Sequence, residues 1–144
     1  MQVSGGPWVR MALLCERVIE DKEGVLTIVR VVDRVITTVQ AQGVDPPAQM
    51  PPLDYATNLV ITLTAGDALG RHTVNVETEG PDGQTKPGPS FTVVFESPDR
   101  GTNLIINMQL RLEKEGLHWF NVLLEDRLLS RVPLRVVYAP TRIG

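Results

Sequence analysis

The stretch GLHWFNVLLEDRLLSRVPLRVV, residues 116–137, decides the fold. Alternate positions face the same side before and after the short polar turn Glu125-Asp126-Arg127; they are His118, Phe120, Val122 and Leu124, then Ser130, Val132, Leu134 and Val136. A period of two is typical of half-buried β-strands, so the stretch predicts a β-hairpin. A hairpin alone is only marginally stable in water, and a second layer must therefore cover its apolar face.

Similar alternations recur along the chain between clusters of turn residues. They cover residues 9–19, 25–39, 58–64, 70–79, 91–96 and 103–112. No segment has a convincing helical period, and short strands at this spacing predict an antiparallel β-sandwich of about eight or nine strands. Charged residues interrupt the run Val25–Val39, so we expect that strand to bend or change sheet around Val32-Asp33.

The length of 144 residues suits one domain with a self-sufficient core. We expect a flexible N-terminus over residues 1–7, one β-sandwich domain over 8–138, and a flexible C-terminal tail over 139–144. Proline pairs at 46–47 and 51–52 predict an extended loop over Gln40–Asp54, because proline lacks the N–H that a sheet requires. A second flexible link is predicted over Gln84–Pro89.

Composition excludes several classes of function. The net charge of −3 offers no broad cationic field for nucleic acid. No apolar run approaches the roughly 20 residues that cross a bilayer as a helix, so we expect no membrane insertion. The N-terminus lacks the pattern of a secretory signal, and the lone Cys15 cannot close an intrachain disulfide. We therefore expect a cytoplasmic protein.

Residues that could carry chemistry are few and scattered. Cys15, His72 and His118 are the candidates for a hydrolase, but each falls at a strand position expected to face the core. For His72, which follows Arg71 at a strand start, an exposed position is the equal alternative. The loop aspartates stand singly and are good turn residues; they are Asp45, Asp67, Asp82, Asp99 and Asp126. Neither G-x-G-x-x-G nor a P-loop occurs. We expect no catalytic residue, no metal site and no cofactor.

The remaining candidate is the surface. Trp119 and Leu123 alternate with Phe120 and Val122, so they are expected to project outward. With Ile105, on the polar face of a strand taken to be a neighbour, they would form an apolar patch for a protein partner or a second copy. If the strand phase is wrong by one, Trp119 lies between the sheets instead. A surface without assembled catalytic residues predicts a non-catalytic domain that acts through protein–protein contacts, as a self-assembling or accessory subunit. The alternative is a small-ligand module that binds a sugar or nucleotide in loops 40–54 and 84–89.

Two resemblances support the fold. Leu112 precedes His118 by six residues, and Phe120 and Val122 follow; this pattern resembles immunoglobulin-like and fibronectin-type domains, with His118 in place of their corner tyrosine. Residues 12–21 (ALLCERVIED), 32–35 (VDRV) and 131–137 (RVPLRVV) resemble a family of uncharacterised bacterial proteins of unknown function. Together the resemblances imply an immunoglobulin-like β-sandwich, and neither implies an activity.

Overall fold

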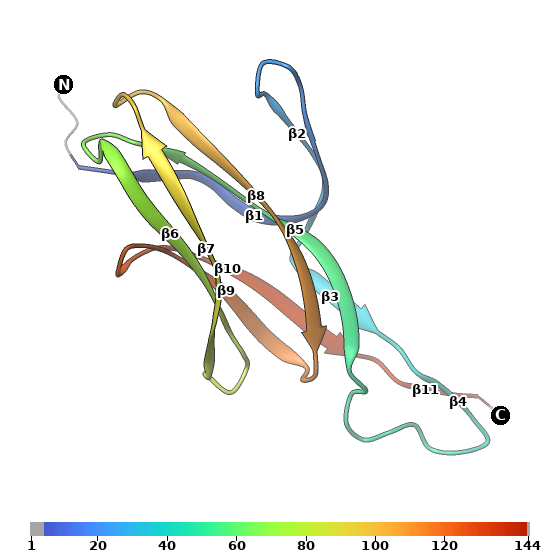
Figure 1. Cartoon of the computed structure of the whole chain (residues 1–144). Coiled ribbons are helices and arrows are strands. Elements are labelled where there is room, and N and C mark those ends of the chain that lie inside the picture. Colours follow the sequence, from blue (N-terminus) through green and yellow to red (C-terminus); the bar gives the residue numbers. More distant parts are fainter. Residues whose placement is uncertain (1–4, 144) are drawn as a thin grey trace.

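The computed structural model describes residues 5–143, which form β-strands joined by turns and loops (Figure 1). The strands are β1 (Trp8–Glu20), β2 (Leu26–Val32), β3 (Arg34–Thr37), β4 (Gln40–Gln42), β5 (Leu53–Thr64), β6 (Gly70–Glu79), β7 (Thr85–Phe95), β8 (Gly101–Leu112), β9 (Gly116–Leu124), β10 (Arg127–Tyr138) and β11 (Thr141–Ile143). Within residues 5–143 no helix is present, and so none spans a membrane. The all-β prediction is confirmed.

The strands form two large sheets with one core between them. The four-stranded sheet has the order β2-β1-β5-β8, the five-stranded sheet β3-β10-β9-β6-β7, and a small sheet pairs β11 with β4. Both large sheets contribute to the buried core, for example Leu14, Leu59 and Ile106 from the first and Val74, Phe120 and Leu134 from the second. The strand count exceeds the eight or nine expected. The pairs β3–β10 and β4–β11 are parallel, so the sheets are not purely antiparallel.

The hairpin of residues 116–137 is confirmed. It consists of β9 and β10, with Glu125 and Asp126 at the turn. Glu125 has a φ of 53°, the left-handed conformation that such a tight turn needs. Phe120 and Val122 of β9 are buried opposite Val132 and Ser130 of β10. The register shifts between Leu128 and Ser130, so a bulge offsets the two halves of β10.

The predicted change of sheet at Asp33 is also confirmed. β2 ends at Val32 in the four-stranded sheet, and β3 begins at Arg34 in the five-stranded sheet. The carbonyl of Asp33 accepts a hydrogen bond from the backbone N–H of Arg135 at 2.9 Å, which fixes the crossing. A single residue, Asp33, therefore links the two sheets.

The proline-rich segments are more regular than expected. Residues 85–89 of the expected link 84–89 belong to β7, at the edge of the five-stranded sheet. An edge strand tolerates proline because its outer N–H positions need no partner. A Cβ added to Gly88 would lie 2.3 Å from the carbonyl oxygen of Val76, so glycine is required where β7 approaches β6. In the expected loop 40–54 the ends belong to β4 and β5, which leaves residues 43–52 as the connection.

The chain ends are held by local contacts where they are described. Residues 1–4 of the expected flexible N-terminus and residue 144 lie outside the described residues. The N–H of Gly5 donates to Asp67 Oδ2 at 2.7 Å, and Pro7 is buried. In the segment expected to be a flexible tail, β11 pairs with β4. Residues 40–42 and 141–143 thus extend the body beyond the two large sheets.

Candidate functional site

Trp119 of β9 lies on the outer face of the five-stranded sheet. Phe120, Val122 and Leu124 belong to the buried core, so the alternate residues Trp119 and Leu123 lie on the opposite, outer face. The cross-strand partner of Trp119 is Pro133, and that of Leu123 is Leu128. The structure therefore places two of the three residues expected to form an interaction surface on the same sheet face, four positions apart on β9.

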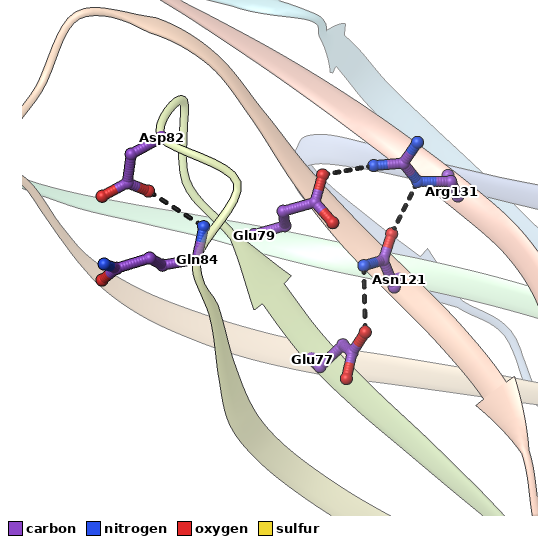
Figure 2. Close-up of polar contacts among 6 residues, drawn as sticks. All are labelled: Glu77, Glu79, Asp82, Gln84, Asn121 and Arg131. Atoms are coloured by element: carbon purple, nitrogen blue, oxygen red, sulfur yellow. Dashed lines mark hydrogen bonds and ion pairs between the residues drawn. The ribbon is translucent and has the colours of Figure 1, made fainter. Parts of the chain in front are cut away.

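A polar network holds Arg131 over Trp119. The Cζ atom of Arg131 lies 4.2 Å from the centroid of the Trp119 ring. Arg131 Nε donates to Asn121 Oδ1 at 2.9 Å, and Nη2 donates to Glu79 Oε2 at 2.6 Å (Figure 2). Asn121 Nδ2 donates in turn to Glu77 Oε1 at 3.1 Å. We name Trp119, Arg131, Asn121, Glu77 and Glu79 the Trp119 cluster.

Hydrogen bonds fix the polar side chains of the Trp119 cluster. Asn121 is only 4% exposed, and its amide fixes both a carboxylate and the guanidinium. Hydrogen bonds to charged groups are stronger than neutral ones, and a cation over an indole face adds about 0.5–1 kcal/mol at an exposed site. Because Arg131 and Glu79 are partly exposed, water screens much of their mutual attraction. The contacts thus order the tryptophan and the arginine on one face of the sheet.

Ile105 lies elsewhere. It belongs to β8 of the four-stranded sheet, where its in-register partner is Val60, and Val60 is also the partner of Leu13. Ile105 is 41% exposed on the outer face of that sheet. The sequence pattern treated β8 as a neighbour of β9, whereas the two strands belong to different sheets. The structure therefore does not bring Ile105 to Trp119 and Leu123.

The residues considered for nucleophilic catalysis are also separated. Cys15 is fully buried in β1 of the four-stranded sheet, and desolvation raises the pKa of its thiol. Both histidines belong to the five-stranded sheet. His72 Nδ1 lies 3.3 Å from Glu125 Oε1, and His118 Nε2 lies 2.8 Å from the carbonyl oxygen of Lys114. The three side chains do not form a nucleophile–base pair.

The burial of Cys15 gives a direct chemical prediction. Alkylation requires an accessible thiolate, and a buried thiol with a raised pKa supplies neither access nor charge. We expect iodoacetamide at about pH 8 to label the native protein at least about tenfold more slowly than the urea-unfolded protein. Mass spectrometry of the intact chain measures both rates. Equal rates would restore Cys15 as a candidate nucleophile.

Three of the loop aspartates contact other parts of the chain or their own turn. Asp45 pairs with Arg142, Asp67 accepts from the N–H of Gly5, and Asp99 accepts from Ser97. In residues 5–143 no three His, Cys, Asp or Glu side chains are grouped as a metal site would require.

Asp82 makes two contacts that lower the pKa of its carboxyl group. Its Oδ1 accepts from the N–H of Gln84 at 3.1 Å (Figure 2), and its Oδ2 accepts from Lys114 Nζ at 3.1 Å. The Gln84 hydrogen bond first, and Lys114 second, lower the pKa of Asp82 below 3.8. Because the pKa is lowered in the folded state, these contacts stabilise the fold at pH values above about 3.8. This stabilisation is lost as the pH falls through the folded-state pKa of Asp82.

An NMR titration of the Asp82 carboxyl carbon is therefore expected to give a midpoint below 3.8. Lys114→Ala should raise the midpoint without returning it to the ordinary value, because the Gln84 hydrogen bond remains. A midpoint at or above 3.8 in the wild-type protein would show that the turn is not closed as described.

Two shallow hollows lie away from the loops considered for ligand binding. One, of about 500 Å³, is lined by Gly6, Pro7, Ala68, His72, Leu124, Glu125, Asp126 and Arg127. The other, of about 250 Å³, is lined by Val94, Phe95, Glu96, Arg100, Gly101 and Thr102. Neither is lined by residues 40–54 or 84–89.

Comparison with known proteins places the chain in a family. A model described as a family of unknown function, DUF6941, matches residues 10–137, and the chain belongs to that family. No curated protein sequence matches it. The predicted resemblance to a family of unknown function is thereby confirmed.

Similar solved structures contain the fold as a small part of a larger chain. A beta-glucosidase from Listeria innocua matches with a TM-score of 0.51 and 9% identity, over 76% of this chain and 15% of that one. A beta-glucosidase from Kluyveromyces marxianus matches with a TM-score of 0.48 and 16% identity, over 58% of this chain and 12% of that one. An alkylpurine DNA glycosylase from Pseudomonas fluorescens matches with a TM-score of 0.46 and 13% identity, over 69% of this chain and 27% of that one. At such identities only the fold is comparable, and of these three structures the Listeria beta-glucosidase has a TM-score above 0.5.

Proposed function

We propose that this protein is a non-catalytic domain that binds another protein chain through the outer face of its five-stranded sheet, as a self-assembling or accessory subunit. The observation that carries the proposal is the position of Arg131, 4.2 Å above the Trp119 ring and hydrogen-bonded to Asn121 and Glu79. Tryptophan and arginine are the residues most enriched among those that dominate binding energy at protein interfaces.

The rigidity of the Trp119 cluster supports the same proposal. A partner that binds a mobile arginine must order it, at about 0.5–1.5 kcal/mol for each such side chain. Here Asn121 and Glu79 already hold the guanidinium in one orientation. The face is a sheet surface rather than a cavity, which suits a protein surface better than a small molecule.

We further propose an immunoglobulin-like architecture. In immunoglobulin domains strands A, B and E share one sheet, and strands C, F and G the other. The orders β1-β5-β8 and β10-β9-β6 support this arrangement, with β1, β5 and β8 as A, B and E, and β6, β9 and β10 as C, F and G. β2 is then an addition at the edge. The single buried Cys15 supports a cytoplasmic setting.

Affinity purification tests the proposed function. The tagged full chain is expressed in cells of its own source together with a differently tagged second copy, and co-purifying chains are quantified by mass spectrometry. We expect Trp119→Ala to lower the recovery of the bound chain at least about tenfold, since a residue of this kind contributes about 2 kcal/mol or more.

Ile105→Ala is the matched control, because it removes an exposed apolar side chain from the opposite outer face. Circular dichroism and the thermal midpoint establish that both variants are folded. Unchanged recovery with Trp119→Ala, or the same loss with Ile105→Ala, would remove the five-stranded face as the binding surface.

A further inference from the structure

Two arginines lie side by side on the proposed binding face. Arg34 of β3 is the in-register partner of Arg135 of β10, and both are exposed. Val35 packs against the core and Leu134 is buried, so both arginines project from the outer face. Within residues 5–143 neither arginine belongs to an ion pair. Like charges on directly paired positions repel, so this pair destabilises the sheet until an anion lies against it.

The arginine pair is continuous with the Trp119 cluster. Arg135 is the partner of Leu117 on β9, and Pro133, two residues before it on the same face, is the partner of Trp119. Ile36, two residues after Arg34, is 59% exposed. A cationic centre with apolar side chains around it therefore extends the same face toward β3, and it matches a partner that is acidic and partly apolar.

The same chain presents such a surface at the tip of its β1–β2 hairpin. Figure 1 shows this turn standing away from the two sheets, at the top of the picture. The tip contains Glu20, Asp21 and Glu23 against the single cation Lys22, and in residues 5–143 none of them forms an ion pair. The tip is flanked by Ile19 and Val25, which are 42% and 58% exposed.

The acidic tip is shaped in advance. Asp21 Oδ1 accepts hydrogen bonds from the N–H groups of Glu23 at 2.8 Å and Val25 at 3.0 Å, which hold the turn closed. The carboxylates of Glu20 and Glu23 are exposed beside it. Little ordering is then required when this turn meets a cationic surface.

Within one chain the two surfaces are too far apart to meet. The turn and Arg34 lie at opposite ends of β2, whose 7 residues span roughly 20 Å in an extended strand. The contact therefore requires two molecules. Because the tip and the arginine pair are different surfaces, two molecules can each place a tip on the other's arginine pair, or each molecule can bind one neighbour with its tip and another with its arginine pair.

We propose that the acidic turn of one copy, residues 20–24, docks against Arg34 and Arg135 of a second copy, with Ile19 and Val25 against the apolar side chains beside them. This inference rests on the proposed function and names its partner as a second copy of this chain. Such a contact either pairs two molecules reciprocally about a two-fold axis or links them head to tail into a ring or filament.

Sedimentation velocity over a concentration series in low salt tests the contact with the purified full chain. We expect the wild-type protein to associate, and R34E/R135E to weaken association at least about tenfold through repulsion of the acidic turn. E20K/E23K should weaken it equally, by repulsion of the arginine pair. A mixture of the two variants should associate again, since each then supplies the surface that the other has lost. Added salt should weaken the wild-type assembly.

R10E/R100E is the control, because it makes the same change in net charge at exposed arginines of β1 and of the β7–β8 turn, outside the five-stranded face and the acidic tip. R34S/R135S, which removes charge without reversing it, replaces R34E/R135E if that variant fails to fold. A wild-type protein that stays monomeric, arginine variants that associate as tightly as wild type, or a mixture that stays dissociated would each overturn the proposal. If arginine reversal leaves the co-purified chain in place while Trp119→Ala removes it, the proposed function stands and the self-contact fails.

Discussion

Replacing Phe120 with alanine is expected to lower the free energy of unfolding by about 3–5 kcal/mol. Phe120 is 2% exposed and is the largest fully buried side chain near the centre of the core, on the central strand β9. Its removal forfeits the transfer free energy of the ring and leaves a cavity that the two sheets close only in part. Domains of this size are stable by about 5–15 kcal/mol, so a large share of the stability would be lost.

Urea unfolding followed by circular dichroism measures the effect. Leu128→Ala is the matched control, because this side chain is 52% exposed on the adjacent strand β10; we expect a change within about 0.5 kcal/mol. A loss below about 1 kcal/mol for Phe120→Ala would mean that the sheets do not pack through this residue.

Replacing Asn121 with alanine is expected to cost about 1–3 kcal/mol of stability and to weaken binding of the partner chain. The amide of Asn121 is buried between Glu77 and Arg131 and bonds to both. Without it, two charged groups lose a hydrogen-bond partner at a partly buried position, and Arg131 is no longer fixed over Trp119. We therefore expect the recovery of the partner chain to fall about tenfold, as for Trp119→Ala.

The control is Asn107→Ala, at an exposed position on β8 of the other sheet. Its expected effect on stability is within about 0.5 kcal/mol, with no effect on binding. Thermal unfolding and the co-purification measurement are made on the same preparations. An Asn121→Ala protein that is as stable as wild type and binds equally well would show that the hydrogen-bond network has no role in the surface.

Local alternation predicted the strands well because burial of one face imposes it directly. The hairpin of residues 116–137, the change of sheet at Asp33 and the alternation of β8 all followed from residues that are neighbours in sequence. The order of strands in a sheet depends on contacts between distant segments, and the sequence pattern carries no signal for it. Ile105 was therefore grouped with Trp119 although the two residues belong to different sheets.

The Trp119 cluster was only half visible in the sequence for a related reason. The phase of β9 places Trp119 outward, but Arg131 meets Asn121 only because the register of β10 shifts between Leu128 and Ser130. A bulge leaves no reliable mark in the residue pattern. Arg34 and Arg135 are paired in parallel strands, and about a hundred residues separate them in the sequence. The sequence pattern therefore did not predict this pair. Proline is a poor strand former, and the prolines in residues 84–89 therefore predicted a flexible link. The prediction missed that an edge strand such as β7 tolerates proline.

The two tryptophans provide the most direct test of binding through the five-stranded face. Trp8 begins β1 and Trp119 lies in β9, so their indole N–H signals in an NMR spectrum report on different sheets. As the partner chain, or further copies of this chain, are added to labelled protein, we predict that the Trp119 signal shifts or broadens first while the Trp8 signal keeps its position. A Trp8 signal that changes while that of Trp119 stays constant would contradict binding through this face.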